Sequence, residues 1–263
     1  MKVLIVNTSA AGGGAAIAAL RLTDALRANG VEAGMLVRDC AAPHEGVKAL
    51  PQSPVLRLKF LWERLVIWMH NRLSRRMLWY VDIANTGTDI TRLPEFRQAD
   101  VIHLHWINQG FLSLAGLERI LQSGKRIVWT MHDQWPYTGI CHHSVDCLRY
   151  RDHCHHCPQL CHPSARDLSY QVFARKLRIM RQARITFVGC SRWIARLAEQ
   201  SALTQGHRVE SIPNAVPSVF SPMDKAEARR AHGLPEEGKY ILFGSCKVAD
   251  RRIARNAEFA AAL

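Results

Sequence analysis

Short apolar runs alternate with amphipathic stretches along most of the chain. The run KVLIVN at 2–7 predicts a buried strand, and three glycines at 12–14 follow it. The next residues predict a helix that Gly30 ends, and AGMLVR at 33–38 predicts a second strand. The apolar stripe of that helix is Ile17, Leu20, Leu22 and Leu26. Strand, glycine-rich turn, helix and strand indicate a right-handed βαβ unit with parallel strands.

The same alternation continues to about residue 216. Further strands are predicted at 100–106, 126–133, 184–190 and 207–216, and further helices at 55–79, 113–124, 166–182 and after Ser191. From 217 the pattern starts again with a helix at 224–233, a strand at 239–246 and the beginning of a helix at 255–263. One strand and two helices cannot bury a core. The sequence therefore predicts an α/β fold, with a Rossmann-like parallel sheet in 1–216 and the incomplete start of a second such domain in 217–263.

Composition narrows the range of partners. Hydrophobic residues make up 48% of the chain, which excludes global disorder. The net charge of +13 favours anionic partners such as phosphates, nucleic acid or an anionic membrane. No apolar run approaches the roughly 20 residues of a membrane-spanning helix, and the N-terminus lacks the length and cleavage pattern of a signal peptide. We therefore expect a cytoplasmic protein with reduced thiols.

The glycine run is the first candidate for chemistry. Ligands of open parallel sheets bind at the carboxyl ends of the strands. Gly12, Gly13 and Gly14 let the backbone approach a ligand closely, and the helix that follows offers N–H groups and a partial positive charge to an anion. The run is neither GxGxxG nor a Walker loop, so a flexible turn is the alternative.

Histidines mark the ends of two other predicted strands. His103 and His105 alternate on one strand and face the same side, while His132 and Asp133 end the next strand. An imidazole and a carboxylate in that position can bind sugar hydroxyls, and His132 can contact a reacting group. We expect His103 to be a hydrogen-bonded core histidine.

Five segments together resemble one family. They are NTSAAGGGAAIAALRLTDALRANGVEAGMLV, ADVIHLHWIN, VWTMHDQWPYTG, CSRWIARLA and SIPNAV. In order and spacing they resemble glycosyltransferase family 4, above all its bacterial members that build capsule, exopolysaccharide and O-antigen. The resemblance implies the GT-B fold, in which two Rossmann-like domains face each other across a cleft. It also implies a retaining transfer without a catalytic metal, with the acceptor on the N-terminal domain and the nucleotide-sugar on the C-terminal domain.

The resemblance assigns roles by position. It places the glycine run near the transferred sugar and phosphate, His132 at the position of the family's active-site histidine, and Asn214 in the interdomain linker. From their positions at the strand ends, we also expect Asp133 to be catalytic and His105 to bind substrate. The donor diphosphate would be contacted by two basic residues, Lys247 and Arg252, although Ile253 and Ala254 depart from the family's Lys-Gly pair. The family's ExxxxxxxE motif would lie beyond Leu263, so we expect a chain cut short in its donor domain.

A cysteine-rich segment at 141–162 follows the predicted active-site strand. Cys141, Cys147, Cys154 and Cys157 have the spacing C-x5-C-x6-C-x2-C, which predicts a structural Zn²⁺ that orders a long loop. An ordinary reduced loop and a pair of disulfides are the alternatives. Neighbouring side chains leave a Cys3His site open: Cys161, His142, His143, His155, His156 and His162. Cys40, Cys190 and Cys246 are expected to be isolated buried thiols.

The predicted helix at 55–79 mixes basic residues with tryptophans. These are Arg57, Lys59, Arg64, Arg72, Arg75 and Arg76, with Trp62, Trp68 and Trp79. The pattern is typical of a helix on an anionic membrane surface, where tryptophans lie at headgroup depth. A helix whose apolar face packs on the sheet is the alternative.

The sequence as a whole predicts a glycosyltransferase of bacterial surface polysaccharide synthesis. It would move a sugar from a nucleotide-sugar to a glycan or polyprenyl-linked acceptor, in the cytoplasm or on the inner face of the membrane. A non-catalytic acceptor- or membrane-binding remnant is the first alternative. A zinc-containing nucleic-acid-binding protein is the second. The cysteine spacing does not fit a C2H2 finger, so we expect no nucleic-acid partner.

Overall fold

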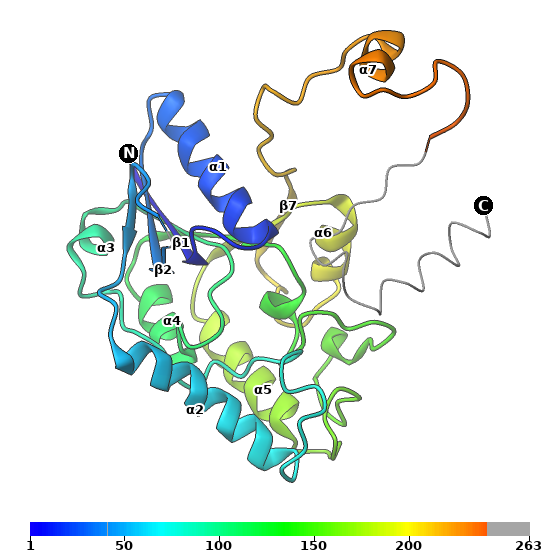
Figure 1. Cartoon of the computed structure of the whole chain (residues 1–263). Coiled ribbons are helices and arrows are strands. Elements are labelled where there is room, and N and C mark those ends of the chain that lie inside the picture. Colours follow the sequence, from blue (N-terminus) through cyan, green and yellow to red (C-terminus); the bar gives the residue numbers. More distant parts are fainter. Residues whose placement is uncertain (41, 241–263) are drawn as a thin grey trace. The chain divides into compact units, whose positions relative to one another are not determined.

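The computed structural model describes residues 1–40 and 42–240 (Figure 1). The chain divides into two compact units, Met1–Pro217 and Ser218–Leu263. The second unit contains α7 (Lys225–Ala231), which confirms the helix predicted at 224–233. Most of the strand predicted at 239–246 lies outside the described residues, as do the helix at 255–263, Cys246, Lys247 and Arg252.

The first unit is built on one sheet of seven parallel strands in the order β3-β2-β1-β4-β5-β6-β7. The strands are β1 (Lys2–Ser9), β2 (Glu32–Asp39), β3 (Val47–Ala49), β4 (Val101–Leu104), β5 (Arg126–Met131), β6 (Ile185–Gly189) and β7 (Arg208–Ser211). The order reverses between β1 and β4, which makes the sheet doubly wound. The predicted α/β, Rossmann-like fold is confirmed.

Helices connect the strands and cover the sheet (Figure 1). They are α1 (Gly14–Ala28), α2 (Pro54–His70), α3 (Pro94–Gln98), α4 (Leu114–Leu121), α5 (Leu168–Met180) and α6 (Arg192–Glu199). Two 3-10 turns, η1 (Trp135–Tyr137) and η2 (Arg149–Arg151), lie in the long connection from β5 to α5. The helix predicted after Ser191 is confirmed, because the Ser191 side chain caps α6 by accepting from the Ile194 N–H.

Alternate residues of the central strands pack into two separate hydrophobic cores. In β1, Leu4 and Val6 belong to the larger core and Val3 and Ile5 to the smaller one. The smaller core lies under α1, where small side chains let the helix approach the sheet. These are Ala16, Ala18, Ala19 and Thr23. The predicted apolar stripe is therefore wrong at Ile17, whose side chain is exposed, while its three leucines are half-buried against this core.

Helix α2 is shorter than predicted. It ends at His70 rather than continuing to residue 79. The next residues leave the helical region, with φ of 49° at Arg72 and 64° at Leu73. The Asn71 side chain fixes this turn, since its amide donates to the Arg76 carbonyl and its oxygen accepts from the Cys161 N–H.

Candidate functional site

One open pocket of about 410 Å³ lies at the carboxyl edge of the sheet. It is lined by the end of β1, the turn before α1, and residues that follow β4 and β5: Asn7, Thr8, Ser9, Gly12, Gly13, Gly14, Ala15, Ala16, Trp106, Gln109, His132 and Asp133. We call it the glycine pocket. The structure thus brings together two motifs predicted separately from the sequence, the glycine run and the His-Asp pair.

The glycine run is required for its backbone conformation. Gly12 has a φ of +87° and Gly13 a φ of +115°, which other residues rarely adopt. A Cβ at either position would meet nothing within 4 Å, so the glycines do not serve internal packing. Helix α1 begins at Gly14 without a side-chain cap. Its N-terminal N–H groups and partial positive charge therefore face a pocket that can accept an anion.

Three neighbouring histidines extend from the core to the pocket wall. His103 Nε2 lies 2.8 Å from Thr130 Oγ1, and His105 Nδ1 lies 2.8 Å from His132 Nε2. Burial lowers the pKa of His103 to about 4 and also lowers the pKa of His105 and His132. All three are therefore neutral near pH 7. The expectation of a hydrogen-bonded core histidine is confirmed for His103. His105 is buried behind His132 and does not line the pocket.

The hydrogen-bond pattern indicates the tautomer of His132. His105 Nε2 is buried and has no hydrogen-bond partner among the described residues. A buried unpaired N–H costs more than a buried lone pair, so the His105 proton belongs on Nδ1, where it is donated to His132 Nε2. The His132 proton then lies on Nδ1. His132, half-buried at the pocket wall, can offer this N–H to a ligand.

Asp133 holds the wall of the pocket together. Its Oδ2 accepts from Trp106 Nε1 at 2.8 Å, and its Oδ1 accepts from the Trp135 N–H at 2.9 Å. Oδ2 also lies 2.6 Å from His142 Nδ1. Burial favours the protonated form of Asp133, but His142 and the other donors outweigh it and lower its pKa. Asp133 is an ionised group that positions its neighbours.

His142 bridges two carboxylates, a pairing that the sequence pattern does not predict. Its Nε2 lies 2.6 Å from Asp82 Oδ2, opposite the contact with Asp133. Although burial lowers the pKa of His142, the hydrogen bonds to Asp133 and Asp82 raise it to about 10. Both ring nitrogens are occupied, so His142 is not available as the metal ligand that the sequence left open.

Arg64 completes this network. It forms an ion pair with Asp82 and donates to the carbonyls of Leu78 at 2.7 Å and Val81 at 3.0 Å. The interpretation of Arg64 as a lipid-facing cation is therefore wrong. The heptad-like spacing of α2 could have placed Arg64 on the buried side, since Ile67, three residues on, is fully buried.

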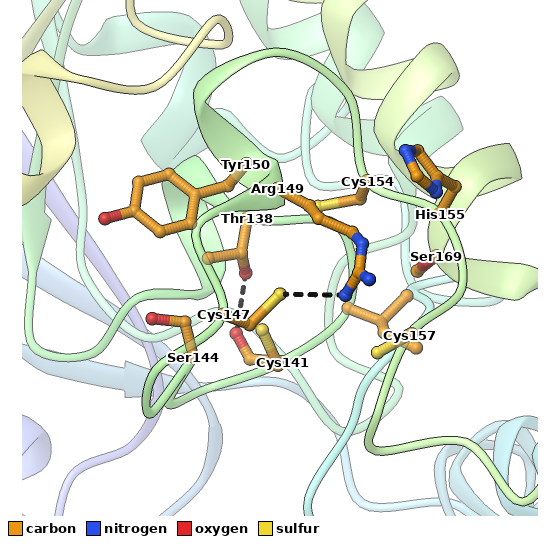
Figure 2. Close-up of a pocket in the computed structure, with 11 residues that line it drawn as sticks. Thr138, Cys141, Ser144, Cys147, Arg149, Tyr150, Cys154, His155, Cys157 and Ser169 are labelled. Atoms are coloured by element: carbon orange, nitrogen blue, oxygen red, sulfur yellow. Dashed lines mark hydrogen bonds between the residues drawn. The ribbon is translucent and has the colours of Figure 1, made fainter. Parts of the chain in front are cut away.

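The four predicted metal ligands line one small cavity of about 20 Å³ (Figure 2). Cys141, Cys154 and Cys157 are buried and Cys147 is half-buried, and all are free thiols. Cys161 lies outside the lining, and among the neighbouring histidines only His155 belongs to it. Among the described residues, no group of three or more Cys, His, Asp or Glu side chains has the geometry of a metal site. We call the small cavity lined by the four cysteines the cysteine cavity.

The remaining predicted residues lie elsewhere or outside the described part. Asn214 is exposed and does not line the glycine pocket. Lys247 and Arg252 are not among the described residues. Cys40 and Cys190 are half-buried, so they are less buried than expected.

A doubly wound sheet with a glycine turn and a histidine at its carboxyl edge is typical of α/β proteins whose ligands bind where the strand order reverses. The chain matches the Glycosyltransferase Family 4 profile over residues 12–219, and it belongs to this family.

Two further similarities accompany this match. The chain is 30% identical over 98 residues to the Escherichia coli K12 protein named "Putative colanic acid biosynthesis glycosyl transferase WcaC". The aligned region covers 34% of this chain and 24% of that protein. It also resembles the crystal structure of Anabaena Alr3699/HepE in complex with UDP, with a TM-score of 0.41 and 14% identity over 89% of this chain and 50% of that chain. The chain thus spans about a quarter of the first protein and half of the second.

Among the described helices, none combines the length and apolar character needed to span a bilayer.

Proposed function

We propose that the protein is a retaining glycosyltransferase that moves a sugar from a nucleotide-sugar to a lipid-linked glycan acceptor in bacterial surface polysaccharide synthesis. Family membership supports the transfer of a sugar. The similarity to a protein named for colanic acid biosynthesis supports the polysaccharide. The observation that carries the proposal is the glycine pocket, where the turn before α1 and His132 line one volume.

The pocket provides groups that suit this reaction. A departing nucleoside diphosphate gains negative charge, which the N-terminal N–H groups and dipole of α1 stabilise without a metal. The Nδ1–H of His132 donates to a sugar hydroxyl or a phosphate oxygen. Because burial lowers the pKa of His132, it acts as a neutral donor rather than as a cation.

The exposed side of α2 supports a membrane-bound acceptor. Apolar side chains are exposed along α2 and the turn after it: Val55, Leu58, Leu61, Trp62, Leu65, Met69, Leu73, Trp79 and Tyr80. Arg57, Arg72, Arg75 and Arg76 are exposed in the same segment. Apolar and aromatic side chains interleaved with cations complement an anionic lipid surface. We propose that this segment docks on the inner face of the cell membrane.

Glycosyl transfer is tested by incubating the protein with a panel of nucleotide-sugars and polyprenyl-diphosphate-linked acceptors, and measuring release of nucleoside diphosphate. We expect acceptor-dependent release with one donor, and a product that keeps the donor's anomeric configuration by NMR. Binding of the acceptor without turnover of any donor would contradict the proposal and favour a non-catalytic binding module.

Membrane docking is tested by co-sedimentation with vesicles of anionic or neutral phospholipid. We expect binding to anionic vesicles that weakens with salt and falls at least tenfold in Trp62→Ser. The control is Trp193→Ser on α6, since Trp62 is 52% exposed and Trp193 61% exposed. Equal loss in both variants, or equal binding to neutral vesicles, would contradict docking through α2.

A further inference from the structure

The cysteine cavity is a site that the glycosyl transfer reaction does not use. We propose that Cys141, Cys147, Cys154 and Cys157 bind one structural Zn²⁺ as a four-thiolate centre. This proposal does not depend on the proposed function.

The size of the cavity suits a single ion. A volume of about 20 Å³ holds one atom-sized occupant, and all four thiol-bearing side chains surround it (Figure 2). The cysteines come from three parts of a long connection, with Cys141 paired to Val81 in an isolated bridge. Zn²⁺ prefers four tetrahedral ligands, and thiolates are among the ligands it binds most readily. The four cysteines line the same cavity, so the proposal requires their sulfur atoms to converge on one ion when it binds.

The Gly139 backbone lies against Cys154, because a Cβ on Gly139 would lie 3.4 Å from the Cys154 sulfur. Gly139 has no room for a side chain, since a Cβ would lie 2.8 Å from the Ser169 carbonyl and 3.2 Å from Cys154 Cβ. The close approach of this backbone to Cys154 therefore requires glycine.

A buried lysine contacts one residue of the cavity lining, Thr138. Lys176 is fully buried, and its Nζ donates to the carbonyls of Trp135 at 2.7 Å and Thr138 at 3.1 Å. In the described part of the chain it forms no ion pair with a carboxylate, and burial lowers the pKa of its ammonium well below the ordinary value.

The nearest carboxylates already have partners. Asp82 pairs with Arg64 and His142, and Asp133 pairs with His142. A buried ammonium without a counter-charge is costly. Four thiolates around Zn²⁺ carry a net charge of −2, which supplies that counter-charge. Arg149, whose Nη1 lies 3.8 Å from Cys147 Sγ, adds a second cation from the surface.

The structure also narrows the ligand set. His142 is held between two carboxylates, and Cys161 lies outside the cavity. His155 lines the cavity, but its Nδ1 lies 2.8 Å from His156 Nδ1. Four cysteines are therefore favoured over Cys3His. Because Cys141 precedes His142, a bound ion would fix the segment that carries His142 to Asp133.

The first test is the zinc content of the protein purified in reductant without added metal or chelator. We expect one zinc per chain, lost in Cys154→Ser and Cys157→Ser and retained in Cys161→Ser, the control from the same loop. A wild-type protein that contains no zinc and takes none up on reconstitution would overturn the proposal. Zinc that persists in Cys154→Ser would overturn the assigned ligands.

A second test needs no cysteine variant and remains valid if those variants do not fold. Cobalt(II) substituted into the wild-type protein should give the intense visible absorption and thiolate charge-transfer bands of a tetrahedral four-sulfur site. A spectrum typical of nitrogen or oxygen ligands would overturn the proposal. In Lys176→Met, zinc affinity measured by chelator competition should fall about 10- to 100-fold, as expected for a group that supports metal ligands. An unchanged zinc affinity would show that Lys176 does not stabilise the charge of the proposed zinc site.

Discussion

The glycine pocket and the cysteine cavity are both walled by the connection from β5 to α5, yet they differ in almost every physical property. The first is open, about 410 Å³ in volume, and lined by glycine backbone and a neutral imidazole. The second is about 20 Å³ and lined by thiols, and a buried lysine contacts its lining. The open pocket has room for a substrate, whereas the small cavity has room for a single ion. Residues of one connection therefore line both sites.

The two sites meet at Cys141 and His142. Cys141 lines the cavity, and His142 contacts Asp133 in the wall of the pocket.

The largest expected effect comes from removing the contact between His142 and Asp133. In His142→Gln the ion pairs with Asp82 and Asp133 are lost and two buried carboxylates remain. The free energy of unfolding should then fall by about 3–5 kcal/mol in denaturant titration. The control, His143→Gln, changes an exposed neighbour and should cost less than about 0.5 kcal/mol.

A change in the open pocket should act on the rate more strongly than on stability. Removing the proposed donor in His132→Ala should lower the rate of sugar transfer about 100- to 1000-fold. It also leaves the buried His105 N–H without its acceptor, which should lower the free energy of unfolding by about 1–3 kcal/mol. The exposed His44→Ala serves as the control and should keep full activity. A His132→Ala variant with wild-type turnover would remove His132 from the mechanism.

The pH dependence of stability separates the two groups of histidines. The folded-state pKa of His142 is about 10, above its ordinary value of 6.5, so its contribution is complete below pH 6.5 and is lost as pH rises toward 10. The slope is at most about 1.4 kcal/mol per pH unit. His103, with a pKa of about 4, contributes stability above pH 6.5 that is lost as pH falls toward 4. Urea unfolding at several pH values measures the free energy of unfolding on the acid and the alkaline side. In His142→Gln, the decrease between pH 6.5 and pH 10 should become smaller.

The smallest effect concerns the glycine turn. Gly13→Ala forces alanine to a φ of +115° and should lower the free energy of unfolding by about 1–3 kcal/mol. Gly14→Ala is the matched control, because it lies in the first turn of α1 with open space around it and should be neutral or stabilising by up to about 1 kcal/mol. Equal effects in both variants would show that conformation does not explain the glycine at position 13.

The sequence predicted the parts of the site that depend on local pattern. Apolar runs located the strands, and strand ends placed the glycine run and His132 at the same edge of the sheet. The cysteine spacing likewise predicted which four thiols lie together. What it could not predict depends on tertiary pairing, because Asp82 and His142 are 60 residues apart and neither belongs to a periodic segment. The end of α2 at His70 has the same origin, because the next residue, Asn71, accepts a hydrogen bond from the distant Cys161 N–H.

Native mass spectrometry of the protein, with and without a nucleotide-sugar, tests the central contrast most directly. We predict that one zinc stays bound to every molecule in both conditions, while the nucleotide-sugar adds reversibly and without further metal. Protein without zinc, or zinc that appears only together with the nucleotide-sugar, would contradict the account, because it would leave the cysteine cavity without its ion or move the metal to the open pocket.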